Sequence, residues 1–311
     1  MALTLTATEV EMYAGTSLFQ YQLLDYFGES SMRFMGPKAA EVINQTVVQS
    51  GTAANFADGQ SHLSGAATIK GVEIPLTPPL KARVDVKRSD VDTRPDMNLL
   101  SDLGENHGMA VARGRTVRLM NVLSYAANAA SQEFEVDTET TSNDLGDLIA
   151  AGIESIAVAM DTAGVPETNR YGLLYPAGFY KLGLATKIQT KDNGGLGNIQ
   201  TFGGPNAVLP YLNFQIANCG LGFGTDWTDS AYNTPFTGVP TGWRYDMTGV
   251  LGIFWHKDAF AVRHQTTLER SAEWLPEHQS WLTMSRLHFG AKVLGNGMDA
   301  GLYILIDDDD S

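Results

Sequence analysis

The chain has 311 residues but only one cysteine, Cys219. A single thiol cannot form an internal disulfide, and it excludes every metal site that is built from several cysteines. An unpaired thiol fits a protein that folds in a reducing cytosol, where disulfides are rare. We therefore expect a fold that is held together by its own core.

Basic residues are also scarce. The chain has 21 Lys and Arg against 35 Asp and Glu, which gives a formal net charge of -14. A surface that grips nucleic acid needs concentrated Lys and Arg, so this balance argues against a dedicated nucleic-acid-binding protein. No window approaches the roughly 18 consecutive apolar residues of a membrane-spanning helix, and we expect no membrane contact. The apolar fraction of 43% is typical of globular proteins.

Motifs that mark common catalytic sites are missing as well. The sequence has no phosphate-binding loop, no His-Glu-x-x-His pair and no Gly-x-Ser-x-Gly turn. Glu269, Glu273 and Glu277 recur at helical spacing and could pair as acid and base, but nothing in the sequence indicates a pocket or a raised pKa, so a solvated face is favoured. We predict no catalytic, cofactor-binding or metal-binding residue, and no cofactor. An enzyme with an unrecognised site within 171–245 remains an alternative.

Two segments have helical patterns. Between 96 and 130, apolar residues recur at threes, fours and sevens, although three glycines (Gly104, Gly108 and Gly114) each disfavour an unbroken helix by about 1 kcal/mol. The pattern at 145–160 follows a capping sequence at 142–144 and ends at Gly164, with Pro166 beyond it. We therefore expect one long helix and one shorter, well-delimited helix.

The remaining segments favour strands and turns. Residues 82–86 alternate strictly between apolar and charged, which predicts a strand. With the Gly-, Ala-, Ser- and Thr-rich stretch before it, this strand is expected to form a long projecting hairpin. Residues 171–245 are rich in Gly, Asn and Pro and predict short strands and turns, and strands are expected again at 250–262, 280–289 and 301–306. The fold class is therefore α+β.

The order of these segments resembles the capsid fold of tailed bacteriophages, the Hong Kong 97 type. One block is similar to a strand of the short-tailed (podovirus, autographivirus-like) capsid proteins. It reads Gly249-Val250-Leu251-Gly252-Ile253-Phe254-Trp255-His256-Lys257-Asp258-Ala259-Phe260. Leu268-Glu269-Arg270 and the Gly-rich turn after Phe289 resemble further parts of the same group. The resemblance implies five segments: an N-terminal arm (1–49), an E-loop hairpin (50–90), a P-domain with a spine helix (91–168), an A-domain (169–248) and the returning strands of both domains (249–311).

The resemblance also implies a function. The chain would be a major capsid protein that self-assembles, in the cytoplasm of a bacterial host, into the icosahedral shell of a virion around double-stranded DNA. Its expected partners are other copies in hexamers and pentamers, a scaffolding protein, a portal protein, a decoration protein, and DNA by non-specific contact only. The alternative is an encapsulin-like nanocompartment shell of the same fold, which encloses an enzyme.

Two sets of basic residues are the candidate contact sites. The charged face of the predicted hairpin, Lys81, Arg83 and Lys87, is expected to meet acidic surface on a neighbouring subunit. The cluster on the long helix, Arg113, Arg115 and Arg118, is expected either on the inner face near DNA or in ion pairs with acids of the same chain.

Overall fold

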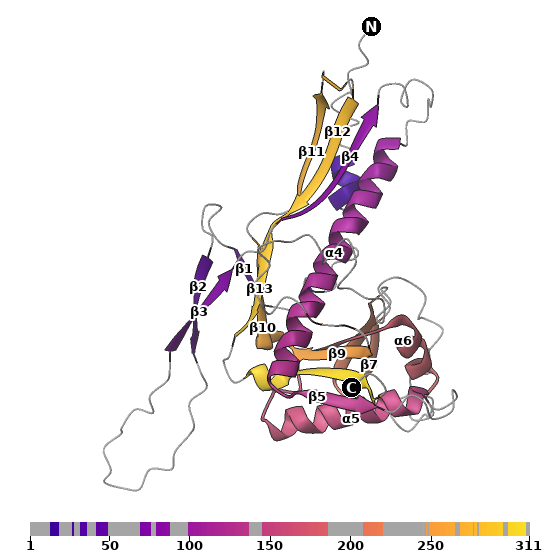
Figure 1. Ribbon diagram of the computed structural model, residues 1–311. Helices are drawn as coiled ribbons and strands as arrows, with labels where there is room; N and C mark the ends of the chain where they lie inside the picture. The colour runs from indigo at the N-terminus through magenta and orange to yellow at the C-terminus, as the bar shows by residue number, and fades with distance from the viewer. Residues whose placement is uncertain are drawn as a thin grey trace.

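The long helix α4 (Leu99–Ala129) runs along almost the whole body, and three sheets lie against it (Figure 1). This computed structural model describes residues 13–18, 27, 32–35, 42–48, 69–75, 79–87, 99–136, 145–185, 208–219, 245, 247, 249–264, 268–275, 277–278, 280–294 and 298–308. Most of 190–245 therefore lies outside the described residues. Helices and strands together give the α+β class that the sequence predicts.

A six-stranded sheet forms one end of the molecule. Its strand order is β5 (Glu133–Val136), β14 (Leu302–Asp307), β9 (Val250–His256), β6 (Arg170–Leu174), β8 (Phe214–Asn218) and β7 (Val208–Tyr211). One face belongs to the core that contains α4, and the other packs against α5 (Leu145–Thr162) and α6 (Pro176–Gly183). Every residue of β9 is buried, because both faces of this central strand are covered.

The predicted strand at 250–262 is confirmed as two strands with a turn between them. At η3 (Lys257–Ala259) the chain leaves the six-stranded sheet and enters β10 (Phe260–His264). Strand β10 lies in a second sheet, between β1 (Met32–Met35) and β13 (Phe289–Val293). The polar triplet inside the apolar run thus marks the passage from one sheet to the next.

The third sheet lies beside the first half of α4. Its order is β11 (Glu269–Leu275), β12 (Ser280–Leu287) and β4 (Leu80–Lys87), all antiparallel. Its inner face packs against α4 and the helical segment 13–18. Glu269 and Glu273 lie on β11, and Glu277 lies in the turn after it. All three are exposed, on a strand and a turn and not on a helix.

Helix α4 is a single element of 31 residues, so its glycines do not interrupt it. At Gly104 the helix segment 13–18 crosses closely, and a Cβ there would lie 2.8 Å from the carbonyl oxygen of Tyr13. Gly104 is thus the residue that permits the crossing, and the packing gained there offsets its low helix propensity.

Helix α5 ends where the sequence predicts. Gly164 has a φ of 74°, and the amide of Val165 donates to the carbonyl of Met160, five residues back. This pairing is a Schellman motif, which needs a residue in the left-handed region and therefore favours glycine.

A two-stranded hairpin, β2 (Val42–Val48) and β3 (Ile69–Pro75), stands off one side of the body (Figure 1). The strand predicted at 82–86 is confirmed as β4, but its assignment to the projecting hairpin is wrong. Strand β4 pairs with β12, some two hundred positions away in the sequence, and the hydroxyl of Thr283 donates to the carbonyl of Val84 across the pair. The other boundaries of the predicted arm and domains stay predictions.

The turn between β7 and β8 offers a test of backbone strain. Leu212 and Asn213 form a two-residue hairpin loop, with φ values of 46° and 66°. Leucine is disfavoured in this region by roughly 1–2 kcal/mol, whereas asparagine adopts it readily. We expect Leu212→Asn to raise the free energy of unfolding by about 0.5–1 kcal/mol in denaturant titrations. Leu212→Ala is the control, because alanine carries the same strain and should bring no such gain.

Candidate inter-subunit surfaces

The projecting hairpin is anchored to the body at its root. Ile74 near the end of β3 is fully buried, and its carbonyl accepts a hydrogen bond from the guanidinium of Arg263 on β10. Opposite Arg263, strand β13 has Gly290. Beyond this root, β2 and β3 pair only with each other among the described strands. An isolated two-stranded hairpin is marginally stable in water, so this one is suited to being covered by another molecule.

The helical segment 13–18 is held between α4 and the β11–β12–β4 sheet by a buried polar cluster. The Tyr13 hydroxyl lies 2.7 Å from Nδ1 of His107 and 3.1 Å from Oγ of Ser285, and Ser17 also reaches Ser285. Arg270 donates to the carbonyl of Ala14. These contacts join residues that are up to 272 positions apart, so they fix the segment 13–18 to the body.

Burial lowers the pKa of His107 from its ordinary value. The unfolded chain therefore binds more protons than the folded chain as the pH falls through about 6.5, and stability is lost on acidification. In denaturant titrations from pH 8 to 5, we expect wild type to lose more stability per pH unit than His107→Asn, by at most about 1.4 kcal/mol. His278→Asn, at an exposed position, should keep the wild-type profile. If the stability of wild type and of His107→Asn changed equally with pH, His107 would not be a source of the loss of stability in acid.

The first set of predicted contact residues lies on the outer face of the third sheet. Lys81 and Arg83 are exposed on β4, and the Arg83 side chain is 56% exposed and pairs with Asp85 at 3.3 Å. Lys87 ends the same strand, in register with Ser280. The structure thus brings these basic residues together, on a packed sheet and not on the hairpin, and their role between subunits stays a prediction.

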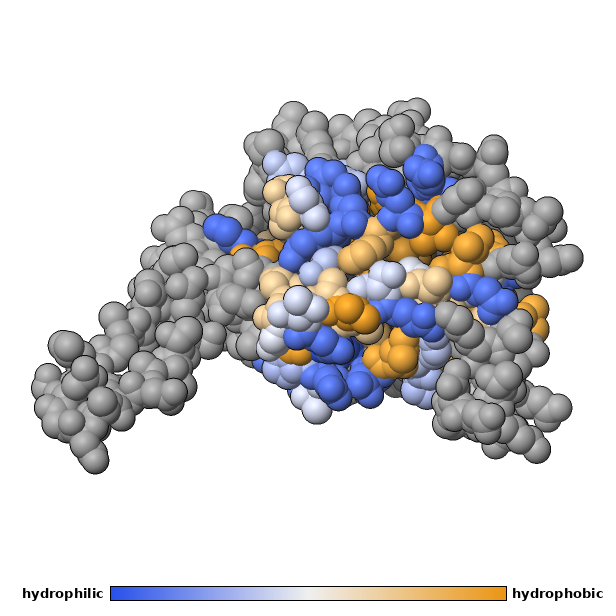
Figure 2. Space-filling model, turned by 90° about the horizontal axis from the view of Figure 1, so that it is seen from below, coloured by the Kyte–Doolittle hydropathy of each residue, from blue (hydrophilic) through white to orange (hydrophobic). Residues whose placement is uncertain are grey.

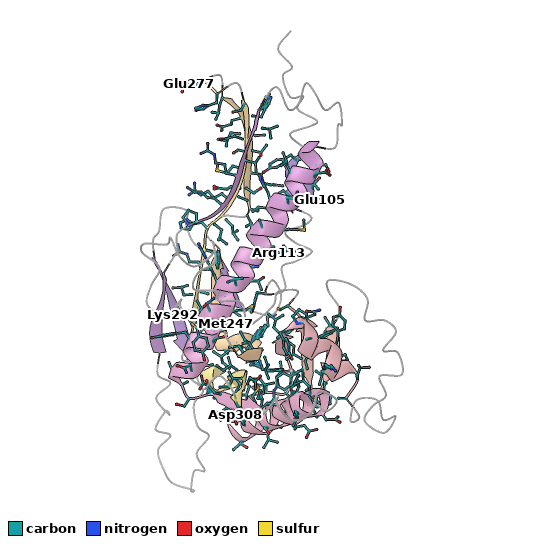
Figure 3. All side chains as sticks on the ribbon, turned by 45° about the vertical axis from the view of Figure 1, so that its right-hand side comes forward. Glu105, Arg113, Met247, Glu277, Lys292 and Asp308 are labelled. Carbon is teal, nitrogen blue, oxygen red and sulfur yellow. The ribbon has the colours of Figure 1, made fainter. Side chains whose placement is uncertain are left out.

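The arginine cluster of α4 is divided by burial. Arg113 is exposed on the helix surface (Figure 3), whereas Arg115 and Arg118 are 2% and 4% exposed. Arg115 lies over the ring of Phe289, and burial lowers the pKa of Arg118 to about 10, which leaves it charged at neutral pH. The prediction of a DNA-facing cluster is therefore corrected for Arg115 and Arg118, because a buried side chain cannot reach phosphate. Arg113 stays a candidate.

Sequence reasoning missed a buried arginine that has several hydrogen-bond partners. Arg170 at the start of β6 is 1% exposed and donates to the carbonyls of Val165 and Pro166 and to the carboxylate of Asp161. Its guanidinium also lies 5.9 Å from the ring centre of Phe214. No local pattern marks such a residue, since its partners come from the helix end and the loop before the strand.

A further surface lies over α5 and α6. Figure 2 shows apolar side chains gathered among polar ones on this face. Val158 on α5, Tyr180 on α6 and Leu184 just after α6 are the exposed apolar residues here, each more than half exposed. Exposed apolar side chains mark a protein interface where they form a contiguous patch, so this face is a candidate contact surface.

Two surveys of the described residues bear on other functions. Within the described part of the chain, no group of three or more His, Cys, Asp or Glu side chains is placed to hold a metal ion. No helix among the described residues is long and apolar enough to cross a membrane.

Comparison with known proteins gives matches in structure alone. No protein-family profile and no curated protein sequence matches the chain. A solved capsid structure of the cyanophage P-SCSP1u is 16% identical with a TM-score of 0.71, over 91% of this chain and 88% of that one. The mature capsid of bacteriophage PhiM1 is 13% identical with a TM-score of 0.65, over 92% and 87%. A virus-like particle from Pyrococcus furiosus is 12% identical with a TM-score of 0.56, over 95% and 98%.

These matches extend over about nine tenths of this chain and a similar share of the other chains. At identities below 20% they establish architecture and leave the activity to be argued separately. The chain has the Hong Kong 97-type capsid fold.

Proposed function

We propose that the chain is the major capsid subunit of a tailed bacteriophage, and that it self-assembles into the icosahedral shell around the double-stranded DNA genome. The observation that carries the proposal is the full-length structural likeness to phage capsid subunits. The narrower proposal, a short-tailed phage, rests on the block from Gly249 to Phe260, which forms β9, η3 and the start of β10.

The geometry of the described residues suits assembly. A closed shell needs contacts between different surfaces of identical copies, arranged around rotation axes. The hairpin β2–β3 extends beyond the body, and an exposed charged sheet face and an apolar patch lie elsewhere on the surface. Several modest contacts per subunit would together give a stable shell through multivalency.

The proposed partners follow from this role. They are other copies in hexamers and pentamers, a scaffolding protein, a portal protein, a decoration protein and packaged DNA, in a virion that is assembled in the host cytoplasm. Arg113 is the remaining candidate of its cluster for non-specific contact with DNA. We propose no catalytic role for the chain.

A second candidate is the shell of an encapsulin-like nanocompartment that encloses an enzyme. The likeness to the virus-like particle of Pyrococcus furiosus keeps this reading open, because that particle shares the fold and is not described as a phage capsid. Its TM-score is lower than those of the two phage capsids, so the phage reading is preferred.

Production of the full chain in bacteria, alone and together with a scaffolding protein, tests the proposal. Sedimentation velocity and negative-stain electron microscopy are expected to reveal closed particles or ring-shaped oligomers. A monomer under every condition, with no particles when scaffold is supplied, would overturn it. Mass spectrometry of particles from the native source then separates the two candidates, because DNA and portal protein indicate a virion and an enclosed enzyme indicates a nanocompartment.

A further inference from the structure

The β11–β12–β4 sheet has one occupied face and one open face. Buried side chains of its inner face, such as Leu80 and Leu287, pack in the core that contains α4, and the segment 13–18 bonds to Ser285 on the same face. The residues that alternate with these along each strand point to the outer side, where no other described element covers them. Lys81, Arg83 and Glu273 on this side are exposed, so they are available to a partner.

Charge on the outer face is divided between the two edge strands. Strand β11 carries Glu269 and Glu273, which we call the acidic edge, and strand β4 carries Lys81 and Arg83, which we call the basic edge. Strand β12 lies between them. Among the described strands, neither edge has a further neighbour.

The ion pairs among the described residues of the sheet do not include Lys81 on the basic edge or Glu273 on the acidic edge. Glu269 lies 3.8 Å from Arg286 on β12, and Arg83 pairs with Asp85 on its own strand. For Lys81 and Glu273, no ion pair is found within the described part of the chain. The two edges are separated by two strand spacings, roughly 10 Å, so Lys81 cannot reach Glu273 in the same copy.

The strand register places Lys81 where its charge destabilises an isolated subunit. Lys81 lies directly opposite Arg286, and like charges opposite each other on neighbouring strands are destabilising. A residue that is unfavourable in the single copy becomes favourable when an acidic group of another copy approaches. Glu273, opposite Leu282 on the other edge, is such a group.

The centre of the outer face is apolar. Leu282 and Met284 on β12 are half-buried and lie between the acidic and the basic edge. An apolar centre with a charged rim is the usual composition of a protein–protein interface. Because basic edges repel each other, the charge division favours contacts that bring opposite edges together, and a closed shell needs such contacts between different surfaces of identical copies.

We propose that the acidic edge of one copy docks against the basic edge of the next, in a head-to-tail contact between subunits. The contact rests on the proposed function, since it is one of the contacts that build the shell. It commits the outer face to a second copy of this chain and identifies Glu273 as the group that Lys81 meets.

Charge reversal tests the contact with full-length protein. We expect Lys81→Glu and Glu273→Lys each to raise the concentration needed for assembly at least about tenfold at low salt, and the double variant to restore assembly. The difference should shrink towards about 1 M salt, where the screening length is about 3 Å. Lys292→Glu, a reversal at an exposed position of β13 away from this sheet, serves as the matched control and should assemble as wild type does.

Folding and assembly are separated by the same variants. Lys81→Glu removes the like-charge opposition to Arg286, so the subunit should unfold at the same or a higher denaturant concentration than wild type. If wild type assembles and both single variants assemble at its concentration, or if the double variant fails to recover, the contact is overturned and the proposed function stands. If wild type does not assemble at all, the proposed function is overturned and the contact with it.

Discussion

Replacement of Arg170 by methionine is expected to lower the free energy of unfolding by about 3 kcal/mol. The buried guanidinium donates to two backbone carbonyls and to Asp161, and hydrogen bonds from a charged group contribute roughly 1.5–3 kcal/mol each. Asp161 is half-exposed and regains water when its partner is lost, so the full sum is not expected. Denaturant titration followed by circular dichroism, at a concentration where the chain is unassembled, measures the change.

Two further substitutions make the Arg170 prediction specific. Arg113→Met removes an exposed arginine from α4 and should change stability by no more than about 0.5 kcal/mol. Arg170→Lys keeps the charge but loses the planar fork that reaches several acceptors, so it should recover only a minor part of the loss. Equal unfolding midpoints for Arg170→Met and Arg113→Met would contradict the role given to Arg170.

Removal of the projecting hairpin is expected to abolish shell assembly and leave the subunit folded. Replacement of residues 44–73 by Asn-Gly closes the chain at the register pair Ile43 and Ile74, with a two-residue turn that suits both neighbours. The buried Ile74 and its bond to Arg263 remain. Because the described parts of β2 and β3 pair only with each other, the free energy of unfolding should change by less than about 1 kcal/mol.

Sedimentation velocity and electron microscopy report the assembly of this variant, and circular dichroism reports its fold. Leu212→Asn, a turn substitution outside the hairpin, is the control and should assemble as wild type does. Shells from the shortened chain would contradict the role of the hairpin in assembly. An unfolded product would place the hairpin in the folding core.

Local signals in the sequence predicted the elements that depend on local physics. The end of α5 at Gly164 and the strand run around Phe254 are confirmed, because a left-handed cap and a doubly buried strand leave direct marks in sequence. The apolar pattern predicts the helix at 96–130 in spite of Gly104, and the reason for that glycine is non-local, because Tyr13 crosses the helix there.

Non-local pairing accounts for the errors. Nothing near residues 82–86 indicates that their strand pairs with 280–287, so β4 was assigned to the wrong hairpin. The spacing of four residues between Glu269 and Glu273 fits one helical turn. The same spacing is a multiple of two, so it equally places both residues on one face of strand β11.

The burial of basic side chains also cannot be predicted from the sequence. Arg115, Arg118 and Arg170 look like surface residues by type, and only their tertiary surroundings remove them from water. Of the candidate contact set, Lys81 and Arg83 are exposed as an interface requires, and Lys87 shares their strand.

A cryo-electron microscopy reconstruction of particles assembled from the full chain tests the central claim most directly. Closed icosahedral shells are predicted, in which each subunit has the described fold and its β2–β3 hairpin lies against a neighbouring copy. A chain that stays monomeric with scaffold present, or particles in which the hairpin contacts only its own subunit, would contradict the account.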